Sequence, residues 1–221
     1  MKKFSLIFIL AVFIFALFLV GCGSANNNVS TNLSDVRCGV FDGKNDDLIA
    51  TFVYGQREQN YAQDGTASPL TDFGIITVNL LKKYDKTQIP FTLKTLDETY
   101  SGTLEKSPYN QQYLTDIEKQ IKDGTLTLVL SLENEEIEIE LNKKSDDFEI
   151  DFNQALKIGE DALKDEILNN NSKRMEFQLK LISQNEIEFG KYFWQFIVIT
   201  EDGNKHFVTF STSNPEILVK N

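Results

Sequence analysis

The side chains of this chain that could carry out chemistry are few, and they stand far apart. His206 is the single histidine, whereas imidazole metal sites use several ligands and an imidazole base needs a nucleophile and an orienting group. The sequence contains no phosphate-binding glycine loop, nucleophile elbow or paired-cysteine metal motif. We therefore expect no catalytic residue, no metal and no cofactor, and we interpret His206 as an ordinary histidine at a strand end.

Acidic side chains are abundant, and they leave alternatives open. With 33 Asp and Glu residues, a carboxyl pair for glycoside hydrolysis can be drawn in many places, so a carboxylate-dependent hydrolase stays an alternative without named residues. The segment 42–47 gathers carboxylate and amide oxygens, which calcium prefers, but it lacks the residue order of a known calcium loop. We interpret this segment as a solvated turn.

The N-terminus has the pattern of an export signal. Lys2 and Lys3 precede an apolar run over residues 4–20, which is shorter than a typical membrane-spanning helix and ends in Leu-Val-Gly-Cys at Cys22. This ending resembles the lipobox of bacterial lipoproteins. The resemblance implies that the Cys22 thiol receives a diacylglyceryl group, that residues 1–21 are removed, and that acyl chains such as palmitate anchor the mature protein on the extracytoplasmic face of the cell membrane.

Lipidation of Cys22 would leave Cys38 without an intramolecular partner, because the chain has two cysteines. An internal disulfide is then impossible, even though the cell exterior allows such bonds. We expect Cys38 to be a buried small hydrophobe, with a reactive or intermolecular thiol as the alternative.

The mature chain is strongly acidic. Loss of residues 1–21 removes two lysines and no acidic residue, which takes the net charge from -11 to -13. Such a surface repels phosphate backbones and anionic headgroups. We therefore expect no nucleic-acid partner, and we expect attachment to the membrane through the lipid alone.

Composition divides the mature chain into a tether and two domains. Residues 22–35 are rich in Ser, Asn and Thr and predict a flexible tether. Residues 36–145 predict a β-rich domain of unknown function, and residues 146–221 predict a second domain after the charged segment 143–147.

The first domain should contain several strands and one helix. Ser107 and Pro108 are typical of a helix start, apolar residues then recur at helical spacing, and Gly124 should end the helix. Runs of Ile, Val, Phe and Thr predict strands. They cover residues 48–54, 73–81, 125–132 and 136–141, and the last of these has one face of glutamates.

The second domain should pack one helix on a four-stranded antiparallel sheet. Asp151 and Gln154 have the spacing of a capping box, and the helix should end at residues 169–171. The expected strands cover residues 175–182, 186–189, 192–200 and 205–212. The fold class expected for the whole chain is α+β.

The second domain resembles the PepSY family of small α+β modules. The resemblance rests on the helix, the strand at 192–200, the turn and strand at 202–208, and the ending at 215–218. It implies a noncatalytic module, often envelope-associated and proposed to restrain or bind peptidases.

A binding surface is expected on the hairpin that turns at Asp202 and Gly203. A two-residue loop would pair Ile199 with His206 and place a group of aromatic and hydroxyl side chains on one sheet face. This face comprises Tyr192, Trp194, Phe196, Phe207, Thr209 and Ser211. We expect the helix to cover the opposite face and this face to bind a ligand; the alternative is that it is ordinary core.

These patterns favour a membrane-anchored extracytoplasmic lipoprotein that acts as a noncatalytic binding or regulatory module for an envelope protein or peptidase. A substrate-binding lipoprotein for a small solute or glycan is the main alternative. A pocket between the two domains with converging polar groups would favour the solute, and an exposed flat sheet face would favour a protein.

Overall fold

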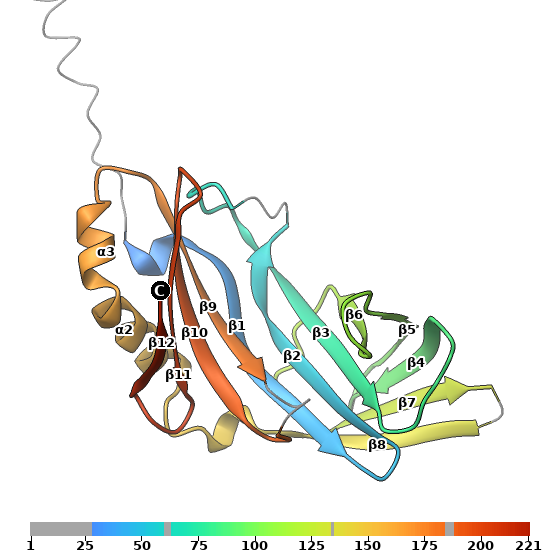
Figure 1. Ribbon diagram of the computed structural model, residues 1–221. Coiled ribbons are helices and arrows are strands. Elements are labelled where there is room, and N and C mark those ends of the chain that lie inside the picture. The colour runs from blue at the N-terminus through green and yellow to red at the C-terminus, as the bar shows by residue number, and fades with distance from the viewer. Residues whose placement is uncertain (1–27, 60–62, 134, 184–187) are drawn as a thin grey trace, which may run out of the picture.

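The computed structural model describes residues 28–59, 63–133, 135–183 and 188–221 (Figure 1). The expected signal peptide and Cys22 lie outside these residues. Within them the chain is mainly β, with 53% of residues in strands and 12% in helices. No helix among the described residues is long and apolar enough to cross a membrane.

The strands form one continuous sheet with the order β12-β11-β10-β9-β1-β2-β3-β6-β5-β4-β7-β8. Their bounds are β1 (Leu33–Lys44), β2 (Leu48–Glu58), β3 (Leu70–Leu80), β4 (Gln88–Lys94), β5 (Thr99–Lys106), β6 (Tyr113–Ile117), β7 (Leu126–Leu132), β8 (Glu135–Lys143), β9 (Met175–Ser183), β10 (Tyr192–Thr200), β11 (Lys205–Ser211) and β12 (Ile217–Lys220).

Strands β1 to β8 close into an eight-stranded barrel. The closure is the antiparallel pairing of β1 with β8, in which Phe41 lies opposite Lys143 and Asp42 opposite Asn142. Alternation of side chains fills the barrel interior: in β8, Ile139 and Leu141 are buried, whereas Glu136, Glu138 and Glu140 are exposed. The predicted strand at 136–141 with one acidic face is therefore confirmed.

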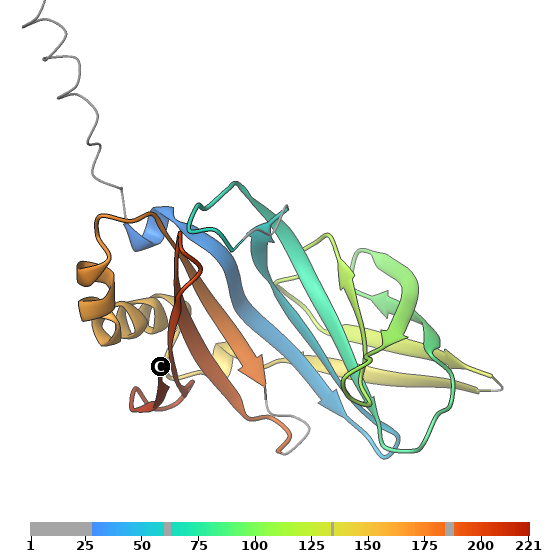
Figure 2. The same ribbon diagram turned by 45° about the horizontal axis from the view of Figure 1, so that its top comes forward.

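Strand β1 belongs both to the barrel and to the sheet that extends from it (Figure 2). Its first half pairs in parallel with β9, and its second half pairs with β8. A register shift between Arg37 and Gly39 separates the two halves, as a β-bulge does when it bends a strand. A Cβ at Gly39 would come within 2.1 Å of the Tyr54 ring, so the bend needs a residue without a side chain.

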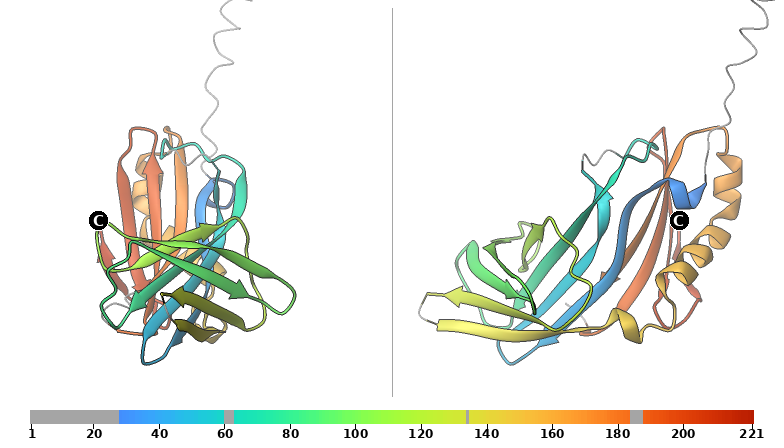
Figure 3. Two further views of the ribbon diagram at one scale, coloured as in Figure 1. Left: turned by 90° about the vertical axis from the view of Figure 1, so that its right-hand side faces the viewer. Right: turned by 180° about the vertical axis from the view of Figure 1, so that it is seen from behind.

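Helices α2 (Phe152–Ala162) and α3 (Lys164–Asn169) follow the barrel, and both lie on one side of strands β9–β11 (Figures 1 and 3). Asp151 caps α2, and Asp151 and Gln154 form the capping box that the sequence predicted. Gly159 lets the helix approach β10 closely, because a Cβ there would stand 2.4 Å from the Phe196 Cβ. Two short 3-10 turns complete the fold, η1 (Val29–Thr31) and η2 (Ser145–Asp147).

The expected helix over residues 107–124 is wrong. The segment instead contains strand β6, which lies in the barrel wall between β3 and β5. Tyr113 and Ile117 are four residues apart, and this spacing places two side chains on one face of a helix and also on one face of a strand. The apolar spacing therefore could not distinguish the two structures, and pairing with neighbouring strands decided between them.

The α+β class and the separate four-stranded sheet are also wrong. β9 continues the barrel sheet through its parallel pairing with β1, so a mainly β protein results, with helices only in 152–169 among the described residues beyond the two 3-10 turns. Residues 186 and 187 of the strand expected at 186–189 lie outside the described residues, and Glu188 and Phe189 are not in a strand. The domain boundary expected at residues 143–147 falls at η2 and stays a prediction.

Candidate functional site

The hairpin of β10 and β11 has a register one residue away from the expected one. Val198 pairs with His206 and Ile199 with Lys205, whereas a two-residue turn would have paired Ile199 with His206. The connection instead spans residues 201–204, and the Thr200 amide donates to the Asn204 carbonyl. A shift of one residue moves every β11 side chain to the other face relative to β10, so the expected binding face is divided.

Tyr192, Trp194 and Phe196 point into the core beneath helix α2. Trp194 is 1% exposed, and its indole N–H donates to the Ile150 carbonyl at 2.9 Å. All three rings belong to one apolar cluster with Met175 and other side chains of β9. These three side chains are therefore structural, which was the alternative left open for them, and the helix covers the face that the sequence analysis had assigned to a ligand.

Phe207, Thr209 and Ser211 lie on the opposite face, where each is half-buried. Figures 1 and 3 show that α2 and α3 cover only the other face. Cross-strand pairing puts Thr209 opposite Gln195, and Gln195 opposite Lys180. The uncovered face is thus polar in its middle, and it is a different surface from the aromatic one that was expected.

This surface continues across β1 and β2. Lys180 of β9 pairs with Arg37 of β1. Asp35, also on β1, lies opposite Arg57 of β2. Partners in register share a face of the sheet, so strands from both halves of the chain build one surface. We call it the polar face, and it comprises Thr209, Gln195, Lys180, Arg37, Asp35 and Arg57.

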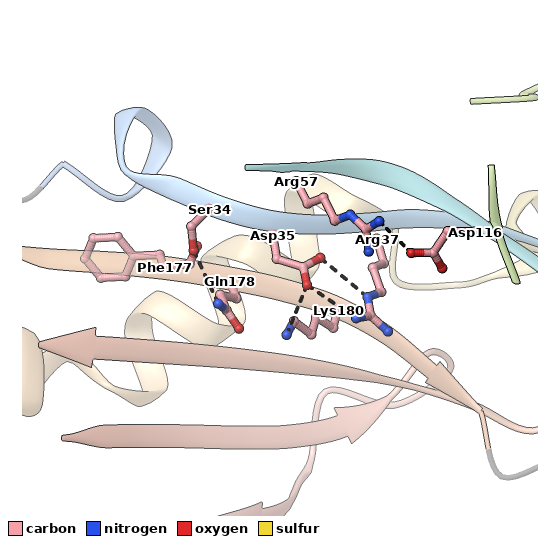
Figure 4. Close-up of polar contacts among 8 residues, drawn as sticks. All are labelled: Ser34, Asp35, Arg37, Arg57, Asp116, Phe177, Gln178 and Lys180. Atoms are coloured by element: carbon pink, nitrogen blue, oxygen red, sulfur yellow. Dashed lines mark hydrogen bonds and ion pairs between the residues drawn. The ribbon is translucent and has the colours of Figure 1, made fainter. Parts of the chain in front are cut away.

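Asp35 is the charged centre of the polar face (Figure 4). Its buried carboxylate accepts from Arg37, 3.3 Å away, and forms an ion pair with Lys180 at 3.1 Å. Arg57 forms a separate ion pair with Asp116 and lies over the Phe73 ring, 4.6 Å from its centroid. The cations therefore have fixed positions, because each is bound to an acid that the sheet holds in place.

Beside this cluster the polar face contains a deeply buried acid. Glu176 is 0% exposed, so its carboxylate is removed from water. Burial, and then the negative charge of Glu58, raise the pKa of Glu176 to about 7. Such a group is near half-protonation at neutral pH, yet it has no contact with solvent through which a substrate could reach it.

Local sequence patterns do not indicate the charged residues of the polar face. Asp35 falls in the predicted tether and Arg37 at the edge of the predicted first domain, because few apolar residues precede them. A signal was present in Gln178 and Lys180, which are polar residues two apart within the apolar run of β9. Polar residues at that spacing share one face of a strand.

A pocket of about 550 Å³ lies at the barrel end near α2. Its apolar wall includes Leu33, Val36 and Phe152, and its polar groups include Gln56 and Lys122. Because Phe152 comes from the helix and the others from the barrel half, the pocket lies between the two regions of the chain. We call it the mouth pocket.

Cys38 also lines the mouth pocket. Its side chain is half-buried, and burial raises the pKa of the thiol. A raised pKa keeps the thiol protonated at neutral pH, and a protonated thiol is a poor nucleophile and a poor metal ligand. The expectation of a small hydrophobe agrees with this environment, although the side chain is not fully buried.

The remaining candidates for chemistry are dispersed. His206 is half-buried on β11. In the segment 42–47, Asp42 is buried against Tyr192, whereas Asp47 forms an ion pair with Lys82. Among residues 28–59, 63–133, 135–183 and 188–221, no group of three or more His, Cys, Asp and Glu side chains is placed to hold a metal ion.

Comparison of the chain with models of protein families, with curated proteins and with solved structures found no match. The resemblances to lipoproteins and to the PepSY family therefore stay predictions. What the site can do chemically follows from its own side chains: it offers hydrogen-bond donors, acceptors and fixed cations on a sheet face, a surface suited to binding.

Proposed function

We propose that the protein is a noncatalytic binding module, held by lipid on the outer face of a bacterial membrane, which uses the polar face to bind an extended segment of an envelope protein or peptidase. The anchor part rests on the sequence pattern that ends at Cys22. The binding part rests on one observation: a row of donors and cations crosses five neighbouring strands, β11, β10, β9, β1 and β2, on the sheet face that the helices leave uncovered.

Charge on the polar face favours a partner segment that carries carboxylates. Arg37, Lys180 and Arg57 supply three positive charges, and their partners Asp35 and Asp116 supply two negative ones. These three cations are the groups of the face that can meet a partner's carboxylates, because Glu176 and Glu58 are buried in the sheet. Complementary charge of this kind steers association and selects among partners.

Burial of the acids supports a noncatalytic role. A glycosidase needs two carboxyl groups about 5–10 Å apart in an accessible cleft. Glu176 has the raised pKa of a general acid, but it is fully buried in the sheet. Glu176 and its neighbour Glu58 are both buried, so they are better explained as structural residues of the sheet than as a catalytic pair.

The mouth pocket supports the second candidate function, capture of a small solute. A volume of about 550 Å³ is within the range of small-molecule sites, and its position between the barrel and α2 is the one that this alternative requires. A ligand for it would combine an apolar body with a group that accepts from Gln56 or Lys122.

Site-directed photo-cross-linking on intact cells tests the binding proposal. A photoreactive residue at Thr209, on the polar face, should give a defined adduct, and one at Lys157, exposed on α2, should not. Arg57→Ala should weaken the adduct strongly, whereas Arg174→Ala should leave it unchanged, because Arg174 pairs with Glu201 beyond the ends of β9 and β10 and is not among the residues of the polar face. Equal adducts from both positions, or none from position 209, would exclude the polar face as the binding surface.

A further inference from the structure

A second pocket with a different chemistry lies at the end of β3. Figure 1 shows this end of β3 on the far side of the barrel from η1. Its volume is about 420 Å³. The residues that decide its chemistry are lysines, tyrosines and one exposed leucine. They are Leu81, Lys82, Lys83, Tyr84, Lys106 and Tyr113, and we call this site the lysine pocket.

Tyr113 fixes the shape of the lysine pocket. Its ring is almost fully buried, and its hydroxyl donates to the Lys86 carbonyl at 2.7 Å, with the Tyr84 carbonyl at 3.2 Å. These contacts hold the backbone of the connection between β3 and β4. The Tyr84 ring consequently has a set position, with its centroid 6.4 Å from that of Tyr113.

Lys106 is the cation that distinguishes this pocket. Lys82 and Lys83 form ion pairs with Asp47 and Asp85. The half-buried Lys106 instead lies over the Tyr113 ring, 5.7 Å from its centroid, and forms no ion pair with any described acid. In a chain with 33 acidic residues, a lysine held in a pocket by an aromatic ring leaves its charge available for an anion.

We propose that the lysine pocket binds a phosphorylated sugar unit. The phosphate would accept from Lys106 and from Lys83, which can exchange an exposed carboxylate partner for a ligand. The apolar face of the sugar ring would lie on Tyr84, with the exposed Leu81 beside it. Aromatic rings that stand beside cations bind ring-bearing anions because one group takes the apolar face and the other the charge.

Both a soluble sugar phosphate and a phosphorylated glycan of the cell surface carry this chemistry. Isothermal titration of the Cys22→Ser protein lacking residues 1–21 can compare glucose 1-phosphate, methyl glucoside, inorganic phosphate and phosphorylated dextran. We expect glucose 1-phosphate to bind at least tenfold more tightly than methyl glucoside or inorganic phosphate. Tighter binding of phosphorylated dextran per phosphate would identify the polymer as the source, and equal or weaker binding would identify the soluble compound.

Two substitutions and one control decide whether this pocket is responsible. Lys106→Gln and Tyr84→Ala should each lower the affinity about tenfold, and Lys157→Gln should leave it unchanged although it removes the same charge as Lys106→Gln. Urea unfolding midpoints close to that of the parent would show that the variants fold. The proposal is overturned if none of the compounds binds, if inorganic phosphate binds as tightly as glucose 1-phosphate, or if Lys106→Gln behaves like Lys157→Gln.

Discussion

The hydroxyl of Tyr192 donates to the carboxylate of Asp42 at 2.6 Å, between strands that are 150 positions apart in the sequence. Both side chains are buried. Asp42 lies in the half of β1 that closes the barrel, and Tyr192 begins β10 in the helix-covered sheet. This hydrogen bond therefore connects the two halves of the molecule beyond Arg37, where the pairing of β1 with β9 ends.

Tyr192→Phe tests the energetic value of that connection. Burial raises the pKa of Asp42, and the Tyr192 hydroxyl partly offsets the increase. Loss of the hydroxyl should lower the free energy of unfolding by about 2 kcal/mol, because a buried carboxylate loses its hydrogen bond. Urea denaturation measures the change. Tyr109→Phe is the control, since Tyr109 is 95% exposed; equal effects of the two substitutions would show that the bond contributes nothing.

Glu176 should make the stability of the protein depend on pH. Its folded-state pKa of about 7 lies above the ordinary glutamate pKa of 4.5, so the folded protein disfavours the ionised form. The stability contribution of this group is therefore fully present below pH 4.5 and is lost as the pH rises to about 7. Glu176→Gln, which cannot ionise, should be more stable than the parent at pH 8 by about 3 kcal/mol.

Urea unfolding of the parent and of Glu176→Gln at pH 4.5 and pH 8 measures this effect. The difference between the two proteins should be small at pH 4.5 and large at pH 8. Glu149→Gln is the control, because Glu149 is exposed and should change stability little at either pH. The interpretation fails if Glu176→Gln retains the full pH dependence of the parent.

Gly159 should be intolerant of a side chain despite its position within a helix. An alanine normally favours a helix over glycine by about 1 kcal/mol. Here its Cβ would overlap the Phe196 side chain, and overpacking of a core typically costs about 1–3 kcal/mol. Gly159→Ala should therefore lower the thermal midpoint, whereas Asn153→Ala on the exposed side of α2 should not. A raised midpoint for Gly159→Ala would contradict the close packing of α2 on β10.

Local signals predicted the second half of the chain better than the first. The capping box at Asp151 and the strands that begin at Met175, Tyr192 and Lys205 depend on near neighbours in the sequence, and the structure contains them. The closed barrel could not be predicted in the same way. It depends on β1 meeting β8 about 100 residues later, and no local pattern encodes that pairing.

Only part of the candidate site could be predicted, because the rest depends on how the strands pair. Phe207, Thr209 and Ser211 do lie on the uncovered face, but the assignment of Trp194 to the same face depended on a hairpin register that was wrong by one residue. Thr200 sets the actual register by closing a longer loop with Asn204. Asp35 and Arg37 belong to a strand that sequence composition had divided between the tether and the first domain, so their part in the site became evident only from the pairing of β1 with β9.

The location of the protein decides which partners the polar face can meet, and the intact mass of the protein purified from membranes tests that location directly. The proposal predicts a chain that begins at Cys22, with the mass of residues 22–221 increased by a diacylglyceryl group, and release of a Cys22→Ser variant from the membrane. A mass that includes residues 1–21, or a Cys22 without lipid, would contradict the proposal that the protein is a lipid-anchored module of the cell exterior.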